Sequence, residues 1–293
     1  MSTHAEREIA SQPACWARAV AAASQVAAAL PARGERVAVV GAGTSWFMAM
    51  AWAALREAAG HGPTDAHAVS EFPARRPYDR VVAITRSGTT TEVLDLLAGL
   101  RSRTATTVLT GDPAAPAARA AGAVVDLGFA DERSVVQTRF ATTALTLLRA
   151  HLGESTDRAI ADVESVLAAP LPLDPATEQV TFLGRGWTIG LAHEAALKCR
   201  EAAGLWTEAY PAMDYRHGPI AIAAPGRAVW VLGELPAGLG GDVARTGATL
   251  VHHPDRDPLA ELVLAQRFAI AAAGRRGLDP DAPRHLTRSV VLR

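Results

Sequence analysis

Cysteine is scarce in this sequence, with only two residues among 293, Cys15 and Cys199. The two are far apart, and neither belongs to a pattern of closely spaced metal ligands. A disulfide framework and a cysteine metal site are therefore not expected, and the reducing cytoplasm is the predicted compartment.

Neither a strong charge imbalance nor a long apolar run occurs in the chain. The formal net charge is −1 and the arginines are scattered, which argues against nucleic acid as a partner. No stretch of 18 apolar residues exists, because the alanine-rich segment 17–30 contains Arg18, Ser24 and Gln25. The first residues are too charged for a signal peptide. We expect a soluble protein without a membrane partner.

The first motif lies at residues 36–59. An apolar run over 36–41 predicts a strand buried on both faces of a parallel sheet, and the helical pattern 46–59 follows a glycine turn. The third glycine of a dinucleotide fingerprint is replaced by Trp46, so that match is weak. Thr44 and Ser45 instead place hydroxyl and amide groups at a helix N-terminus, where a phosphate can bind.

A second junction of the same kind follows the predicted strand 80–85. The loop Arg86-Ser-Gly-Thr-Thr-Thr-Glu92 leads into a predicted helix at 93–100. Helix capping by serine or threonine accounts for one or two of these hydroxyls, but not for all of them. The pattern therefore predicts a second anion-binding loop at the carboxyl end of a strand.

The central motif of the second half follows a short predicted strand at 180–183. Gly184 and Gly186 break the strand, and a helix is predicted over 188–203. Glu194, Lys198 and Glu201 have the spacing i, i+4 and i+7, which places them on one helical face. Two stabilising ion pairs are the alternative to a functional role.

The coarse pattern predicts an α/β protein made of two related units. We expect a helical segment at 1–34 with a helix at 13–30, a first unit at 35–168 and a second at 179–293, separated by Pro170, Pro172 and Pro175. The remaining strands are predicted at 65–69, 106–109, 123–127, 205–208, 228–232 and 249–251, and the remaining helices at 115–121, 138–151, 156–168 and 258–273.

Five motifs together resemble the sugar isomerase (SIS) family. They are Gly43-Thr-Ser45, Thr85-Arg-Ser-Gly-Thr-Thr90, the helix carrying Glu194, Lys198 and Glu201, Tyr215-Arg-His-Gly-Pro219, and the tail Ala282-Pro-Arg-His-Leu-Thr-Arg-Ser-Val290. The resemblance is closest to the isomerase half of glucosamine-6-phosphate synthase and to stand-alone phosphosugar isomerases and deaminases. It implies two SIS-type subdomains, each a parallel sheet flanked by helices in a flavodoxin-like three-layer sandwich.

The resemblance also implies roles for individual residues. Glu201 would be the catalytic base, supported by Lys198 and Glu194, and His217 would open the sugar ring from the neighbouring subunit of a homodimer. The local sequence alone also allows His217 to be a helix-capping residue. The residues that would bind the phosphate or the sugar are Thr44, Ser45, Thr85, Arg86 (in place of a glutamine), Ser87, Thr90, Val135 through its backbone, and Arg288 from the tail.

The predicted function is a phosphosugar aldose–ketose isomerase that moves a proton between C1 and C2 through an enediol or enolamine. An amino sugar phosphate deaminase and a non-catalytic sugar-phosphate sensor are the alternatives. No glutaminase activity is expected, because Ser2 rather than cysteine follows Met1. Arg288 replaces the tail lysine of the synthase and does not readily form a Schiff base. The resemblance implies neither a metal nor a cofactor.

Overall fold

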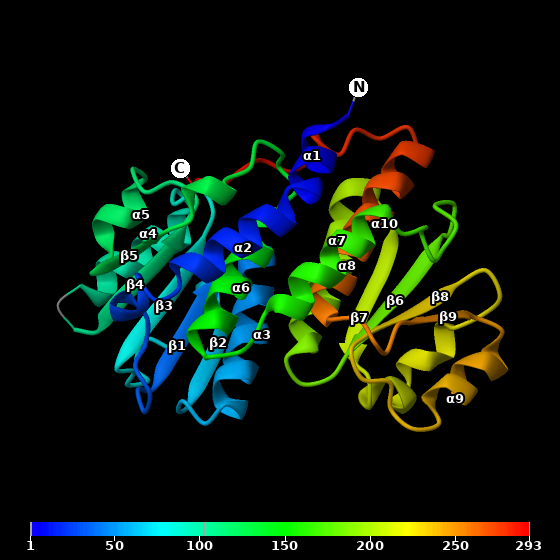
Figure 1. The fold of residues 1–293 in the computed structure, drawn as a ribbon, viewed down its shortest axis with the longest axis horizontal. Helices are drawn as coiled ribbons and strands as arrows, with labels where there is room; N and C mark the ends of the chain where they lie inside the picture. Colours follow the sequence, from blue (N-terminus) through cyan, green and yellow to red (C-terminus); the bar gives the residue numbers. More distant parts are fainter. Residues whose placement is uncertain (1, 102, 293) are drawn as a thin grey trace. The chain divides into compact units, whose positions relative to one another are not determined.

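The computed structural model describes residues 2–101 and 103–292, which form two compact units, each with its own parallel sheet (Figure 1). We call them the five-stranded unit and the four-stranded unit. The five-stranded unit comprises Ala14–Glu132, Arg139–Thr156 and Thr287–Arg293, and the four-stranded unit comprises Met1–Pro13, Arg133–Thr138 and Asp157–Leu286. The predicted α/β class is confirmed.

The five-stranded sheet has the order β2-β1-β3-β4-β5, with all neighbours parallel. Its strands are β1 (Val37–Gly41), β2 (Thr64–Ala68), β3 (Arg80–Thr85), β4 (Ala105–Thr110) and β5 (Ala123–Asp126). Its helices are α2 (Gln12–Ala22, which starts in the other unit), α3 (Thr44–Ala58), α4 (Thr91–Leu100), α5 (Pro116–Ala120) and α6 (Arg139–His151), with short 3-10 turns η1 (Ala27–Ala29), η2 (Val69–Glu71) and η3 (Gly128–Ala130).

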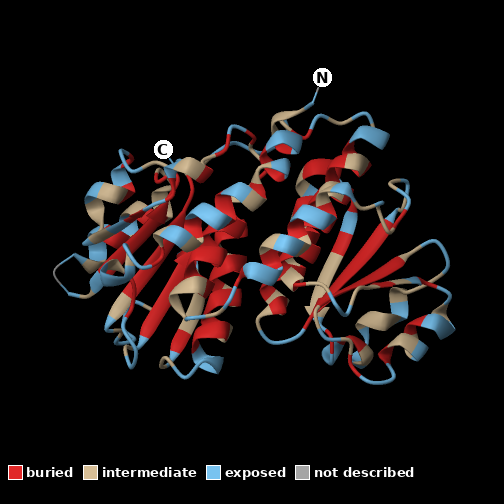
Figure 2. Ribbon diagram, viewed as in Figure 1, coloured by how far each residue is buried: buried red, intermediate tan, exposed pale blue. Residues whose placement is uncertain are grey.

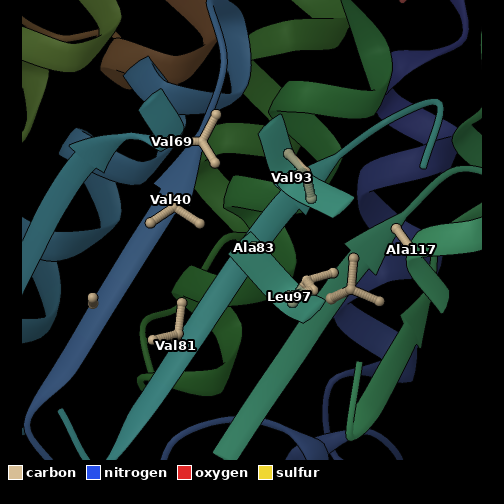
Figure 3. Packing of buried hydrophobic residues seen from close by; sticks show 9 residues of the cluster. Val40, Val69, Val81, Ala83, Val93, Leu97 and Ala117 are labelled. Atoms are coloured by element: carbon tan, nitrogen blue, oxygen red, sulfur yellow. The ribbon is translucent and has the colours of Figure 1, made fainter. Parts of the chain in front are cut away.

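The core of this unit lies on both faces of its central strands. Every residue of β1 and all but the first residue of β3 and β4 are buried, whereas the edge strand β5 is mostly accessible (Figure 2). On one face, Val40, Val81 and Ala83 of the sheet pack with Val93 and Leu97 of α4 (Figure 3). This two-sided burial explains why the central strands are continuous apolar runs in the sequence.

The four-stranded sheet is also parallel, with the order β7-β6-β8-β9. Its strands are β6 (Gln179–Gly184), β7 (Trp206–Pro211), β8 (Ala228–Leu232) and β9 (Thr249–His252). Its helices are α1 (His4–Ala10), α7 (Asp157–Ala168), α8 (Thr188–Ala203), α9 (Leu239–Thr246) and α10 (Pro258–Arg275), with 3-10 turns η4 (Asp214–His217) and η5 (Pro219–Ile222). Within the described part of the chain, no helix combines the length and apolar character needed to cross a membrane.

Each sheet has one place where the order of its strands reverses. In the five-stranded sheet the chain goes from β1 to β2 on one side and then to β3 on the other, so the reversal lies between β1 and β3. In the four-stranded sheet it lies between β6 and β8. Open parallel sheets bind ligands beyond the carboxyl ends of the strands at such points, and the two hydroxyl-rich loops follow β1 and β3.

The N-terminal region differs from the prediction. The helix expected over 13–30 ends at Ala22, and a 3-10 turn follows at Ala27–Ala29. The hydroxyl of Thr107 on β4 donates to the carbonyl oxygen of Ala29 at 2.5 Å, a tertiary contact that holds this turn against the sheet. The short helix α1 was not predicted, although Thr3 and Glu6 form a capping box at its start.

Candidate functional site

The loop after β1 presents its hydroxyls at the start of α3. Gly43 has a φ of 53° and precedes the helix. A Cβ added at Gly41 would lie 2.5 Å from the carbonyl carbon of Ser45, so only glycine permits this close return of the chain. Thr44 and Ser45 are 4% and 3% exposed. The backbone thus places both predicted residues at a helix N-terminus that favours an anion.

The loop after β3 supplies the second group of hydroxyls. The Ser87 hydroxyl oxygen accepts hydrogen bonds from the backbone amide and hydroxyl of Thr89, at 3.3 and 3.1 Å. Thr90 is the N-cap residue of α4. Because β1 and β3 are neighbouring parallel strands, their carboxyl ends lie at the same end of the sheet. Thr85, Ser87 and Thr90 are therefore at the same end of the sheet as the start of α3. The hydroxyl groups expected to bind phosphate therefore converge within the five-stranded unit.

Arg86, the first residue of this loop, is buried, with 2% of its side chain exposed. Its Nη1 lies 3.9 Å from Glu132 Oε2, and its Nη2 donates to the carbonyl oxygen of Arg288 at 3.0 Å. Glu132 in turn accepts from the backbone amide of Arg139 at 2.8 Å. The guanidinium therefore joins the loop to the C-terminal tail and carries a charge partner. A direct contact of Arg86 with a phosphate stays a prediction.

The C-terminal tail lies along the β3–α4 loop. The Thr89 hydroxyl donates to the Ser289 hydroxyl at 3.0 Å, and the Thr91 backbone amide donates to the carbonyl oxygen of Val290 at 3.2 Å. Arg288 donates to the carbonyl oxygen of Glu132 and to the Asp131 carboxylate. Ser289 thereby joins the hydroxyl cluster, although sequence reasoning did not single it out.

In the four-stranded unit, α8 carries the row of charged side chains. A Cβ at Gly184 would lie 2.2 Å from the carbonyl oxygen of Thr188, so the glycine lets the helix start against the end of β6. Glu194 and Lys198 each expose 1% of their side chains and Glu201 exposes 19%. Lys198 Nζ is 3.4 Å from Glu194 Oε1 and donates a hydrogen bond to Glu201. The predicted common face is confirmed by these contacts.

Glu201 also lines a cavity of about 570 Å³ within the four-stranded unit. One wall is the C-terminal part of α8, and the other is the segment 277–286 after α10. This volume is in the range of small-molecule sites. Glu201 thus combines a buried cationic neighbour with a place on the wall of a space that can hold a substrate.

The helix α1 holds two segments of the four-stranded unit. The Glu8 carboxylate, 4% exposed, accepts from the backbone amides of Arg133 and Ser134 at 2.5 and 3.3 Å. The Asp281 carboxylate accepts from the amides of His4 and Ala5 at 2.6 and 2.9 Å, at the start of α1. Glu8 therefore fixes the loop that contains Val135, and Asp281 anchors the segment that lines the cavity.

His217 lies apart from this cavity. It is the last residue of η4, is exposed, and is followed by Gly218 with a φ of 135°. The buried Tyr215 holds the turn against the sheet core. The structure therefore brings Glu194, Lys198 and Glu201 together, whereas His217 is on η4 and is not among the residues that line this cavity. Its contribution across a subunit interface stays a prediction.

Burial also determines the protonation of two neighbours of the charged row. Burial raises the pKa of the Cys199 thiol to about 12, so this cysteine stays protonated near neutral pH. Burial lowers the pKa of His193, and the charge of Arg200 lowers it further. The Cys199 thiol is therefore not a thiolate nucleophile near neutral pH.

Comparison with known proteins confirms the expected resemblance. No protein-family model matches the sequence. A glutamine–fructose-6-phosphate aminotransferase (isomerizing) from Sulfolobus acidocaldarius is 29% identical over 88% of this chain and 50% of its own length. The chain thus spans about half the length of the curated relatives that it matches. The solved C-terminal domain of the glucosamine-fructose-6-phosphate aminotransferase of Francisella tularensis superposes with a TM-score of 0.77 and 20% identity, over 97% of this chain and 99% of its own.

Solved structures show the same fold. The glucosamine-6-phosphate deaminase of Thermotoga maritima superposes with a TM-score of 0.81 and 23% identity, over 99% of this chain and 100% of its own. The tagatose-6-phosphate ketose/aldose isomerase of Escherichia coli gives 0.78 and 18%, over 96% of this chain and 95% of its own. The fold is therefore that of the SIS-type phosphosugar proteins.

Proposed function

We propose that this protein is a phosphosugar isomerase that interconverts an aldose and a ketose sugar 6-phosphate. The observation that carries the proposal is the position of Glu201, which lines the cavity and accepts a hydrogen bond from Lys198. Aldose–ketose interconversion needs one group that removes a proton beside a carbonyl and returns it to the next carbon. A carboxylate on a rigid helix suits this task.

In this proposal Glu201 transfers the proton between C1 and C2, and the intermediate is an enediol or, for an amino sugar, an enolamine. Lys198 orients the carboxylate, because its ammonium donates to Glu201 from a buried position. Glu194 holds the lysine from the other side. The arrangement supports a base whose position does not change during the reaction.

The phosphate is assigned to the hydroxyl loops of the five-stranded unit. Thr44, Ser45, Thr85, Ser87 and Thr90 supply neutral donors, and the starts of α3 and α4 supply backbone amides and favourable dipoles. A phosphate dianion matches such a set of donors without a dedicated cation. Val135 and Arg288 are the further residues predicted to contact the sugar or its phosphate.

A deaminase is the second candidate, favoured by the likeness to the Thermotoga maritima protein. Both reactions begin with proton transfer beside C2, so the same Glu201 serves either. They differ in whether ammonia leaves. The proposal includes a homodimer in which the partner subunit's His217 opens the sugar ring.

A substrate panel tests the proposal. The protein is incubated with fructose, glucosamine, galactosamine and tagatose 6-phosphates, and both sugar interconversion and ammonia release are measured. Interconversion without ammonia supports the isomerase, and ammonia supports the deaminase. Thermal stabilisation by a sugar phosphate without turnover would identify a sensor and contradict both enzymatic proposals.

A further inference from the structure

A second cavity, of about 350 Å³, lies among the helices α1, α7 and α10 of the four-stranded unit (Figure 1). None of the residues that line it also lines the cavity beside Glu201. Its volume is at the lower end of the range of small-molecule sites. The lining residues are Glu6, Ile9 and Ala10 of α1, Leu167 of α7, Leu171 just after α7, and Arg267, Ile270 and Ala271 of α10.

The walls of this three-helix cavity are mostly apolar. Apart from Glu6 and Arg267, every lining residue carries a hydrocarbon side chain. On both α1 and α10 the lining residues have the spacing i, i+3 and i+4, so each helix turns one face toward the space. Ile9 and Ile270 are only 3% and 8% exposed. An occupant with an apolar body is therefore favoured, because its hydrocarbon surface leaves water.

Arg267 supplies a cation at the α7 wall of the cavity. Its Nη1 donates to the carbonyl oxygens of Val166 and Ala169 at 2.5 and 2.7 Å, which places the guanidinium beside Leu167. Arg267 is partly buried, and no carboxylate among residues 2–101 and 103–292 forms an ion pair with it. Burial lowers the pKa of this arginine, and no acidic group offsets the shift.

The acidic residue of the same cavity is already engaged. The Glu6 carboxylate accepts from the backbone amide of Thr3 at 2.8 Å, in the capping box of α1. A cation that is partly removed from water is unfavourable unless an anion lies close to it. The three-helix cavity therefore complements an anionic group attached to an apolar body.

The helix α1 connects this cavity with the candidate active site. Ile9 lines the cavity, while the neighbouring Glu8 holds the loop 133–138 through the amides of Arg133 and Ser134. The start of α1 holds Asp281, in the segment that lines the Glu201 cavity. Because α1 has only seven residues, all these contacts lie within about 10 Å along its axis.

We propose that the three-helix cavity is an effector site for a small carboxylate with an apolar body, such as a medium-chain fatty acid. The carboxylate pairs with Arg267, and the hydrocarbon chain packs against the apolar faces of α1 and α10. Binding stabilises α1 and so orders the two segments that α1 holds. The site itself is independent of the proposed isomerase function; only its effect on turnover rests on that function.

The first experiment measures binding by calorimetric titration of the full chain. Octanoate is the probe, 1-octanol has the same hydrocarbon chain without the charge, and acetate has the charge without the chain. We expect octanoate to bind at least about tenfold more tightly than 1-octanol, because the charge-assisted hydrogen bonds to Arg267 are lost. Acetate should bind more weakly still, since it buries almost no apolar surface.

Variants then locate the site. Arg267→Met should weaken octanoate binding by about tenfold or more, and Arg267→Lys, which keeps the charge, should bind it more tightly than Arg267→Met. Ala271→Phe fills the cavity while Arg267 remains, and it should also prevent binding. Arg276→Met is the matched control, because Arg276 donates to the carbonyl oxygens of Pro175 and Thr177 and does not line the cavity. It should leave the affinity within about twofold.

Hydrogen–deuterium exchange tests the coupling through α1. With octanoate at about ten times its Kd, exchange over residues 133–138 and 279–286 should slow by up to about tenfold in the wild type. Exchange in Ala271→Phe should not respond to octanoate. Slower exchange only around the cavity, with both segments unchanged, would overturn the coupling.

Three results overturn the site. They are no octanoate binding to the wild type, equal affinity for octanoate and 1-octanol, and affinity that survives both Arg267→Met and Ala271→Phe. These assays contain no sugar phosphate, so they are separate from the test of the proposed function. A protein that binds octanoate as described but turns over no sugar phosphate of the panel would contradict the isomerase and leave the effector site in place.

Discussion

Lys198 donates a hydrogen bond to Glu201, three residues further along α8. The same ammonium lies 3.4 Å from Glu194, which is as deeply buried as the lysine. Removing a charge from water at such depth costs several kcal/mol unless an opposite charge is close. The lysine therefore stabilises two carboxylates, and the consequences of losing it differ for folding and for activity.

Lys198→Met should destabilise the fold strongly. The change leaves the Glu194 carboxylate buried without its lysine partner, so we expect the free energy of unfolding to fall by about 3–5 kcal/mol. Urea unfolding monitored by circular dichroism measures the loss. The double variant Glu194→Gln/Lys198→Met should recover most of it. A single variant within about 1 kcal/mol of the wild type would contradict the ion-pair account.

Glu201→Gln should abolish turnover and leave phosphosugar binding nearly intact. Loss of a positioned acid–base group typically lowers kcat by about 100- to 10,000-fold, whereas the isosteric amide preserves the shape of the cavity. Steady-state kinetics and calorimetric titration with fructose 6-phosphate measure the two effects. Glu164→Gln, on an exposed position of α7, is the control. Unchanged turnover would remove Glu201 from the mechanism.

Glu8→Gln should loosen the loop that contains Val135. The carboxylate accepts from the amides of Arg133 and Ser134, and hydrogen bonds to a charged group contribute about 1.5–3 kcal/mol each when fully formed. Hydrogen–deuterium exchange of residues 133–138 should accelerate by about tenfold or more. Glu6→Gln, on the same helix, is the control, because Glu6 only caps α1. Equal protection in both variants would mean that Glu8 does not hold the loop.

Arg288→Met should expose the β3–α4 loop. Arg288 attaches the tail to Glu132 and Asp131, so its loss should increase deuterium exchange over residues 86–91 together with 289–292. Arg284→Met removes an exposed arginine of the same segment that precedes the tail, and it should leave residues 86–91 protected. Exchange confined to the tail would show that the loop is ordered without it.

Acidic pH should destabilise the protein through three partly buried histidines. Burial lowers the pKa of His193, His61 and His67 below the ordinary value of 6.5. The unfolded chain therefore binds more protons than the folded one as the pH falls through 6.5, and the free energy of unfolding decreases. Urea unfolding between pH 7.5 and 5.5 should show this slope.

The matched variants isolate the contribution of His193. His193→Gln should reduce the pH slope without removing it, because His61 and His67 still contribute in the same direction. His217→Gln, on the exposed turn η4, should leave the slope unchanged. A His193→Gln protein with the wild-type slope would show that His193 is protonated equally in the folded and unfolded chain.

Local sequence patterns predicted most of the secondary structure. The helix over 188–203 and the strands over 80–85 and 228–232 agree with the structure residue for residue. The reason is that parallel strands covered on both faces leave long apolar runs, and glycines mark their ends. The helix over 13–30 was predicted too long because alanine favours helix, whereas the hydrogen bond from Thr107 to Ala29 is a tertiary contact.

The candidate site likewise contains residues that local sequence patterns reveal and residues that only tertiary contacts reveal. The hydroxyl loops and the row on α8 are contiguous motifs, so residue type and spacing reveal them. Glu8, Asp281 and Ser289 were missed because each acts on a segment more than 100 residues away. The capping box at Thr3 was the only local signal for α1. Positioning residues of this kind have no sequence pattern of their own.

Lys198 is the only lysine in the sequence, and it is 99% covered in the folded chain. An amine-reactive label consequently meets no lysine side chain on the native surface. Modification of Lys198 requires the helix face that carries Glu201 to open, so the labelling rate is a direct chemical reading of local unfolding at the proposed catalytic base. A compound that rigidifies α8 can then be recognised by slower labelling, without any engineered probe.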